Sequence, residues 1–90
     1  MIEWTSAALG DIGRLHSFLH EKNPEAAAQV VQNLTRAPEI LLSNPRIGEK
    51  LFDFEPEEIR RLLVGQYEIR YQITQSKITI IRIWHTRENR

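Results

Sequence analysis

The sequence predicts an α+β domain in which an N-terminal α-helical hairpin packs on a small, mainly antiparallel sheet of three to four strands. In the first half, apolar residues recur at helical spacing and are interrupted once by the helix-start signal Asn23-Pro24. In the second half, three segments alternate apolar and polar residues and are joined by two-residue links. Because 90 residues with 41% hydrophobic content support one modest core, we expect residues 1–90 to form a single domain.

The first helix is expected to follow a short strand or extended lead-in at Ile2-Glu3-Trp4. Thr5 or Ser6 is a typical N-cap, and the helical pattern runs to about Lys22. The predicted apolar face comprises Ala8, Leu9, Ile12, Leu15, Phe18 and Leu19. The polar side is expected to hold Asp11, Arg14, Glu21 and Lys22.

The second helix begins at Asn23-Pro24, because Asn favours the N-cap and Pro the first helical position. Gly10 and Gly13 in the first helix would allow the second helix to approach closely. Its apolar face is predicted to hold Ala27, Val30, Val31, Leu34 and Leu41. Pro38 cannot continue a regular helix, so we expect a kink there or a separate short segment from Pro38 to Ser43.

Residues 45–57 are predicted to form a loop with Leu51, Phe52 and Phe54 tucked beneath it. Three strands follow, at about Ile59–Val64, Tyr67–Thr74 and Lys77–His85. Strict alternation in the middle strand separates Tyr67, Ile69, Tyr71 and Ile73 from Glu68, Arg70, Gln72 and Thr74. In the last strand Ile81 and Ile83 are expected on one face, with Ile78, Ile80, Arg82 and Trp84 on the other or near its edges.

Charge is distributed unevenly along a chain whose formal net charge is zero. Residues 1–58 hold ten acidic and five basic side chains, whereas residues 59–90 hold two acidic and seven basic ones. A sheet that presents several arginines is suited to an acidic partner. The predicted partner-binding residues are Arg61, Arg70, Arg82, Trp84, His85 and Arg87.

Other features of the sequence exclude several classes of protein. The absence of Cys excludes disulfides and thiolate metal sites, and no apolar run is long enough to span a bilayer. His16 and His20 have the i, i+4 spacing of a metal-binding pair, but no third ligand accompanies them, so a solvated helix face is the better interpretation. We therefore expect a cytoplasmic protein without a cofactor, metal or membrane partner.

The order of these elements resembles that of the RelE/ParE superfamily of bacterial toxins, over essentially the whole chain. The residues that carry the resemblance are Asn44-Pro45-Arg46-Ile47-Gly48, Ile59-Arg60-Arg61-Leu62-Leu63, Tyr67-Glu68-Ile69-Arg70-Tyr71 and the segment from Ile80 to Glu88. The resemblance implies the toxin of a type II toxin–antitoxin pair, neutralised in an oligomeric complex by a small antitoxin encoded beside it. RelE-like members cut messenger RNA on the ribosome, whereas ParE-like members poison DNA gyrase.

The residues bear on the choice between these two activities. RNA cleavage needs a base, a cation for the phosphorane charge and an acid. Arg61 and Arg87 match basic positions of RelE-like enzymes, but Glu68 stands where those enzymes carry an arginine, and a carboxylate there would repel phosphate. His85-Thr86-Arg87 resembles the end of the last strand in ParE-like members.

We therefore predict a ParE-like toxin that traps gyrase without chemistry of its own. The alternative is a ribosome-dependent messenger RNA endonuclease, with His85 as base and Arg61 and Arg87 stabilising the phosphate. A third hypothesis is a protein that still binds antitoxin but has lost its toxicity. Trp84 is expected to pack against a neighbour or to anchor the antitoxin.

Overall fold

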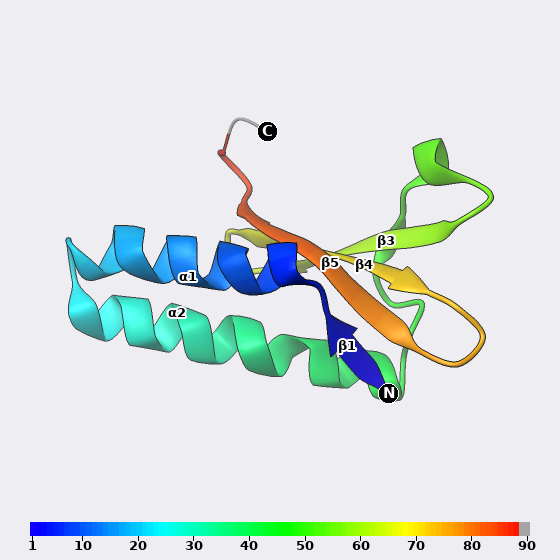
Figure 1. The fold of residues 1–90 in the computed structure, drawn as a ribbon, viewed down its shortest axis with the longest axis horizontal. Helices are drawn as coiled ribbons and strands as arrows, with labels where there is room; N and C mark the ends of the chain where they lie inside the picture. Colours follow the sequence, from blue (N-terminus) through cyan, green and yellow to red (C-terminus); the bar gives the residue numbers. More distant parts are fainter. Residues whose placement is uncertain (89–90) are drawn as a thin grey trace.

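A five-stranded sheet carries two helices on one face (Figure 1) in the computed structural model, which describes residues 1–88. The strands are β1 (Ile2–Trp4), β2 (Glu49–Lys50), β3 (Glu58–Val64), β4 (Tyr67–Ile73) and β5 (Ile78–His85). Their order is β1-β5-β4-β3-β2, with β1 parallel to β5 and the other pairs antiparallel. The predicted class is confirmed, and the strand number exceeds the expected three to four because the very short β1 and β2 both join the sheet.

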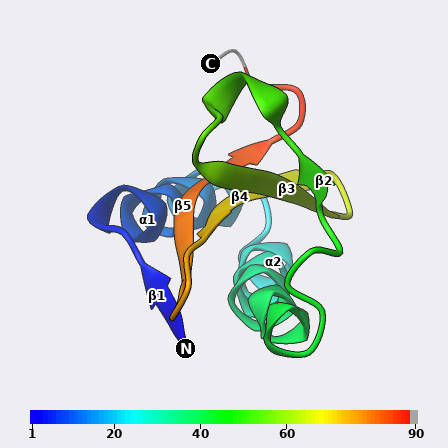
Figure 2. The same cartoon turned by 90° about the vertical axis from the view of Figure 1, so that its right-hand side faces the viewer.

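The helices are α1 (Ser6–His20) and α2 (Pro24–Arg36), and both begin at the predicted N-caps. The Thr5 hydroxyl accepts a hydrogen bond from the backbone N–H of Ala8 at 3.0 Å. The Asn23 side chain accepts from the first two free N–H groups of α2. Figure 2 looks along the helices and shows α1 beside β5 at one edge of the sheet, with β3 and β2 toward the other edge.

Pro38 does not kink α2 but lies in a separate 3-10 helix, η1 (Ala37–Leu42), as the second of the two alternatives predicted. Proline lacks the N–H that would continue the α-helical ladder, so α2 ends at Arg36. The Pro38 side chain is fully buried. The proline that prevents α2 from continuing therefore also contributes to the packing of η1.

The core lies between the helices and the sheet. Its buried members are Ala8, Leu15, Leu34, Leu41, Ile69, Tyr71, Ile78, Ile80 and Ile83. The expectation that Leu9 and Phe18 widen the apolar face of α1 was wrong, since both side chains are exposed. Asp11, expected on the polar side, is buried.

The expectation that Gly10 and Gly13 allow α2 to approach α1 closely was wrong. The glycine at which neighbouring atoms approach the backbone closely is Gly48. A Cβ added at either helical glycine would meet no atom within 4 Å. A Cβ at Gly48 would lie 2.6 Å from the carbonyl oxygen of Arg61 and 2.6 Å from the Tyr71 hydroxyl. That hydroxyl accepts from Gly48 N–H at 3.0 Å and donates to a carbonyl of the 45–47 turn, so it fastens this loop to the sheet.

A β-bulge changes which side chains of β5 face the core. Arg70 is opposite Arg82, but its neighbour Tyr71 is opposite Ile80, so Ile81 is an extra residue in β5. The extra residue shifts the alternation, and Ile78 and Ile80 face the core together with Ile83. The expected separation of Ile78 and Ile80 from Ile83 was therefore wrong.

The loop before β3 contains a short 3-10 helix, η2 (Phe52–Phe54), and its aromatic rings are exposed instead of tucked under the loop. Each ring packs against a cation. The Lys50 ammonium lies 5.1 Å from the centroid of the Phe52 ring, and the Arg70 guanidinium lies 5.5 Å from that of Phe54.

Candidate functional site

The predicted partner-binding residues divide between the two faces of the sheet. Trp84 is opposite Glu68 on the face away from the helices, whereas His85 is opposite Tyr67 on the helix side. Adjacent residues of a strand point to opposite faces, so Trp84 and His85 cannot share one surface. Arg61, Arg70 and Arg82 lie on the face away from the helices with Trp84, and Arg87 lies with His85.

Three arginines form a row across the outer face. Arg61 of β3 is opposite Arg70 of β4, which is opposite Arg82 of β5. Like charges directly opposite each other destabilise a sheet. Glu68 relieves this repulsion, because its fully buried carboxylate lies 2.9 Å from Arg70 and 3.6 Å from Arg61. We call Arg61, Glu68, Arg70, Arg82 and Trp84 the outer-face cluster.

Trp84 completes the cluster by stacking with two of these arginines. The ring centroid is 4.7 Å from the Arg70 guanidinium carbon and 5.2 Å from that of Arg82. Arg70 Nε is buried and has no hydrogen-bond partner, so this guanidinium depends on Glu68 and on aromatic contacts. The cluster is therefore held by ion pairs and ring contacts, with Arg70 mostly covered and the Arg61 and Arg82 side chains 35% and 41% exposed.

The charge asymmetry of the sequence is largely neutralised within the chain. Ion pairs between the acidic and basic halves are Glu3–Lys77, Asp11–Arg82, Arg14–Glu88, Glu49–Arg61 and Glu58–Arg60. Within residues 59–88, Arg87 is the one basic side chain without a carboxylate within 4.0 Å among the described residues. Apart from Glu58–Arg60, these pairs join residues 12 to 74 positions apart, so the sequence could not indicate them.

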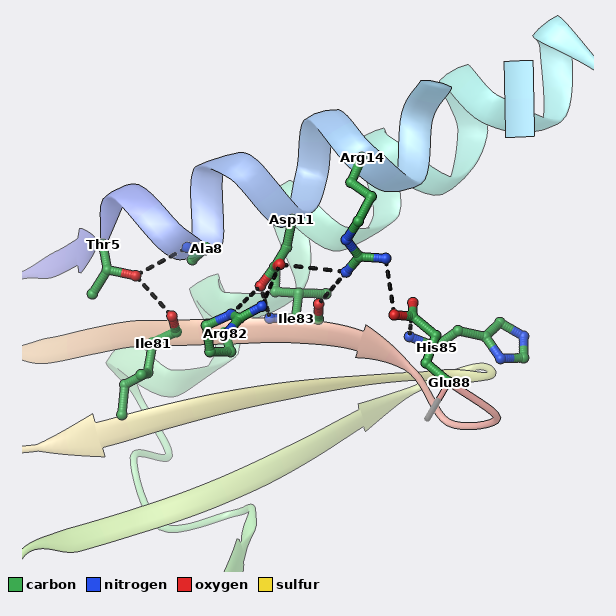
Figure 3. Close-up of polar contacts among 9 residues, drawn as sticks. All are labelled: Thr5, Ala8, Asp11, Arg14, Ile81, Arg82, Ile83, His85 and Glu88. Atoms are coloured by element: carbon green, nitrogen blue, oxygen red, sulfur yellow. Dashed lines mark hydrogen bonds and ion pairs between the residues drawn. The ribbon is translucent and has the colours of Figure 1, made fainter. Parts of the chain in front are cut away.

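Side chains of α1 cover the edge of β5 beyond the point where β1 ends (Figure 3). Thr5 donates to the carbonyl of Ile81 at 2.7 Å, and Asp11 accepts from the N–H of Ile83 at 2.8 Å. Arg14 donates to the carbonyl of Ile83 at 3.3 Å. These bonds satisfy backbone groups that an uncovered edge strand would expose.

Asp11 and Arg14 connect Arg82 of the outer face to Glu88, which follows β5. The Asp11 carboxylate accepts from Arg82 at 2.8 and 3.0 Å and from Arg14 at 3.3 Å. Arg14 also pairs with Glu88 at 2.9 Å, and Glu88 accepts from the N–H of His85 at 3.0 Å. Sequence reasoning missed Asp11, although its spacing between Ala8 and Leu15 already places it on the buried face.

The two carboxylates of this network remain charged. Burial by itself raises the pKa of Asp11, but the hydrogen bonds from Arg82, Ile83 N–H and Arg14 outweigh it and lower that pKa below its ordinary value. Burial likewise opposes ionisation of Glu88, and the bonds from His85 N–H and Arg14 lower its pKa. The network is therefore an ionic clamp between α1 and β5.

Both ring nitrogens of His85 are occupied. Nδ1 accepts from the backbone N–H of Arg87 at 3.1 Å, so the ring proton of the neutral imidazole is on Nε2. Nε2 lies 3.2 Å from the side-chain oxygen of Gln66 and donates to it. The ring also packs edge-on against Tyr67, with centroids 5.1 Å apart. His85 is held as a structural link at the end of β5.

A groove of about 650 Å³ lies between α1 and this end of the sheet. We call it the α1–β5 groove, and it is lined by Arg14, Leu15, Phe18, Leu19, Gln66, Tyr67, His85, Arg87 and Glu88. Its walls are mostly apolar, and burial in them raises the pKa of Tyr67 above its ordinary value. Sequence reasoning found His85 and Arg87 but missed the apolar residues, because Phe18 was assigned only to the apolar face of the first helix and Tyr67 only to that of the middle strand.

No group of three or more His, Asp or Glu side chains within residues 1–88 is placed to hold a metal ion. The His16 and His20 rings stack with centroids 5.4 Å apart. No helix in this part of the chain is long and apolar enough to cross a membrane.

The structure is thus a helical hairpin on one face of a five-stranded sheet, with arginines on the other face. The chain matches the family model described as ParE toxin of the type II toxin–antitoxin system parDE over residues 2–90. It therefore belongs to the ParE toxin family.

One relative in sequence and one solved structure with the same fold were also found. The chain is 32% identical over 80 residues to "Toxin RelE1" of Caulobacter vibrioides. The aligned region covers 89% of this chain and 86% of that protein. A chain of the structure "Chromosomal ParDE TA system from P. aeruginosa" shares the fold, with a TM-score of 0.78 and 21% identity over 93% of this chain and 92% of that one.

Proposed function

We propose that this ParE-family toxin inhibits growth by binding and poisoning DNA gyrase, without cleaving RNA. One observation carries the proposal: a buried carboxylate, Glu68, lies at the centre of the outer-face cluster and pairs with Arg70. Catalysis of phosphoryl transfer needs cationic donors aimed at the developing negative charge. Here Arg70 already donates to Glu68 at 2.9 Å, and Arg61 pairs with Glu49 at 2.7 Å and lies 3.6 Å from Glu68.

The outer face has the composition of a protein-binding surface. Trp, Phe and Arg are enriched at protein interfaces, and Trp and Arg are also enriched among the residues that contribute most to binding. Around the stacked Trp84 and Arg70, the face also exposes Phe54, which lies against Arg70, and Leu63, which is opposite Glu68. An apolar surface with fixed, already paired arginines suits docking onto a folded protein better than neutralising a polyanion.

The second candidate is cleavage of messenger RNA on the ribosome, and the similarity to "Toxin RelE1" favours it. In that mechanism His85 would be the base, and Arg61 and Arg87 would stabilise the phosphate. Arg61 belongs to the outer face, however, whereas His85 and Arg87 line the α1–β5 groove. The three side chains would have to act from different faces of the sheet.

The proposed module has a second component, a small antitoxin that binds this chain in an oligomeric cytoplasmic complex. Membership of the ParE toxin family and the fold shared with a chain of the ParDE system support this partner. A chain that had kept antitoxin binding but lost toxicity would share both features. Growth after induced expression separates the two cases.

The decisive experiment follows DNA, RNA and protein synthesis separately during the first minutes after induction in a bacterial host. Gyrase poisoning predicts that DNA synthesis stops first and that cells filament. An early collapse of protein synthesis with cleaved messenger RNA would support the nuclease instead. Unchanged growth would support the non-toxic protein.

A matched pair of variants connects this result to the outer face. Leu63 on the outer face and Leu42 on η1 are 57% and 60% exposed. Leu63→Asp should relieve growth inhibition, whereas Leu42→Asp should not. Equal toxicity of the two variants would contradict docking through the outer face.

A further inference from the structure

We propose that the α1–β5 groove binds an acidic, amphipathic segment of the antitoxin, with an apolar side chain in the groove and a carboxylate on Arg87. The inference rests on the proposed toxin–antitoxin function and assigns the antitoxin to a surface other than the outer-face cluster. The two partners of the toxin, its antitoxin and its target, then use different faces of the sheet.

The apolar part of the groove is preformed and open. Its volume of about 650 Å³ lies within the range of roughly 300–1,000 Å³ typical of binding sites. Leu15, Leu19 and Tyr67 form the walls, and Phe18 stands at the rim with 59% of its surface exposed. An apolar side chain placed here would cover Phe18 and remove this surface from water.

A second hollow continues the groove beyond Gln66 and Tyr67, which line both. It has a volume of about 300 Å³ and is lined by Val30, Leu34 and Val64, among others. Around the α1–α2 turn, the hairpin extends past the strands along the long axis of the molecule (Figure 1). A peptide segment lying under this end of the hairpin can therefore contact both hollows.

The distribution of paired and unpaired charge indicates an acidic occupant. Arg87 has no carboxylate partner among residues 1–88, and Glu88 beside it is already held by Arg14 and the N–H of His85. The outer-face arginines each have a carboxylate within the chain. An incoming carboxylate would have to displace those partners, whereas on Arg87 it completes a new ion pair.

The backbone around Arg87 is fixed before any partner arrives. Its N–H donates to His85 Nδ1 at 3.1 Å, and the N–H of Thr86 donates to the carbonyl of Gln66 at 2.8 Å. These bonds hold the turn that presents Arg87 at the mouth of the groove. A preorganised cation reduces the entropy lost on binding.

The test measures the Kd of this toxin for the small protein encoded by the reading frame adjacent to its gene, after co-expression of the two. Phe18→Ser and Arg87→Glu should each weaken binding by about 10- to 100-fold. The controls are Leu9→Ser, at a residue of the same helix that is 58% exposed, and Arg36→Glu, at an exposed arginine with no carboxylate within 4.0 Å in residues 1–88. Both controls should bind within about twofold of wild type.

A charge exchange provides the second measurement. Replacing one acidic residue of the neighbouring protein by Arg, at each acidic position in turn, should identify a position that restores affinity to Arg87→Glu. Circular dichroism melting of every variant separates lost contacts from lost folding. Normal affinity of folded Phe18→Ser and Arg87→Glu would overturn the proposal, as would an equal loss in Leu63→Asp on the outer face.

The growth phenotype distinguishes this failure from failure of the proposed function. If the wild-type chain arrests growth and its neighbour relieves the arrest, while the groove variants bind normally, the groove assignment is wrong and the toxin function stands. If the wild-type chain neither arrests growth nor binds the neighbouring protein, both proposals are wrong.

Discussion

Asp11 on α1 accepts two hydrogen bonds from the guanidinium of Arg82 on β5, 71 residues later in the chain, at 2.8 and 3.0 Å. The same carboxylate accepts from the N–H of Ile83. Asp11 therefore neutralises one arginine of the outer-face cluster and also completes the hydrogen bonding of an edge strand. The helical hairpin is attached to the outer face of the sheet through this residue.

Removing the Asp11 carboxylate should destabilise the fold. Asp11→Ala leaves the N–H of Ile83 buried without its acceptor and removes the partner of Arg82, and we expect a loss of about 2–4 kcal/mol in the free energy of unfolding. Urea denaturation followed by circular dichroism measures it. Asp53→Ala, at an exposed aspartate of η2, should change stability by less than about 0.5 kcal/mol. Similar losses in the two variants would contradict the role of Asp11.

Stability should fall in acid because of the same network. The pKa values of Asp11 and Glu88 are lowered in the folded state, so protons bind preferentially to the unfolded chain. The stabilisation is therefore complete above the unfolded-state pKa values of about 4 and is lost as pH falls through the lower folded values. Urea midpoints between pH 7 and pH 3 should show a smaller acid loss in Asp11→Asn than in wild type. Parallel pH curves for the two proteins would exclude Asp11 as a source of this dependence.

Glu68 and Arg70 should be energetically coupled. Glu68→Gln leaves two arginines opposite each other without the buried charge between them, and Arg70→Met removes the cation that Glu68 holds. A double-mutant cycle should give a coupling energy of about 1–3 kcal/mol. Additive effects on the free energy of unfolding would show that the pair contributes nothing specific. The matching cycle for Gln72→Ala with Arg70→Met should be additive within about 0.5 kcal/mol.

Two glycines should respond to alanine in opposite directions. Gly48→Ala would place a Cβ 2.6 Å from the Arg61 carbonyl oxygen and the Tyr71 hydroxyl, and we expect a loss of about 1–3 kcal/mol. Gly13→Ala adds a methyl group where no atom lies within 4 Å and favours the helix, with a gain of up to about 1 kcal/mol. Thermal melting of both variants tests the pair. A neutral Gly48→Ala would show that the 45–48 loop adjusts without cost.

His85→Gln should leave growth inhibition unchanged if the toxin acts by binding a target through the outer face. Both ring nitrogens of His85 already bond within the chain, and a glutamine side chain supplies one donor and one acceptor. The measurement is the growth rate after induction, compared with that of Leu63→Asp at an equal protein level. Loss of toxicity in folded His85→Gln, with toxicity retained in Leu63→Asp, would favour the nuclease.

Local rules of the sequence predicted the order of the elements. Thr5 and Asn23 are N-caps because their side chains accept the free N–H groups of the next turn, and this depends on neighbouring residues alone. The β3–β4 hairpin follows in the same way from Gly65, which adopts a positive φ of 59°. The bulge at Ile81 was not predictable from the same pattern, because it depends on how β5 pairs with β4.

The sequence by itself determined the class of fold, the positions of the helices and main strands, and the set of arginines available to a partner. Tertiary structure alone decided which of those arginines are free. Ion pairing depends on short distances, 2.9 and 3.0 Å in the Arg14–Glu88 and Glu3–Lys77 pairs, between residues 74 positions apart, and no local pattern encodes it. Folding therefore neutralises most of the basic sheet through Glu3, Asp11, Glu49, Glu58 and Glu68, and leaves Arg87 beside an apolar groove.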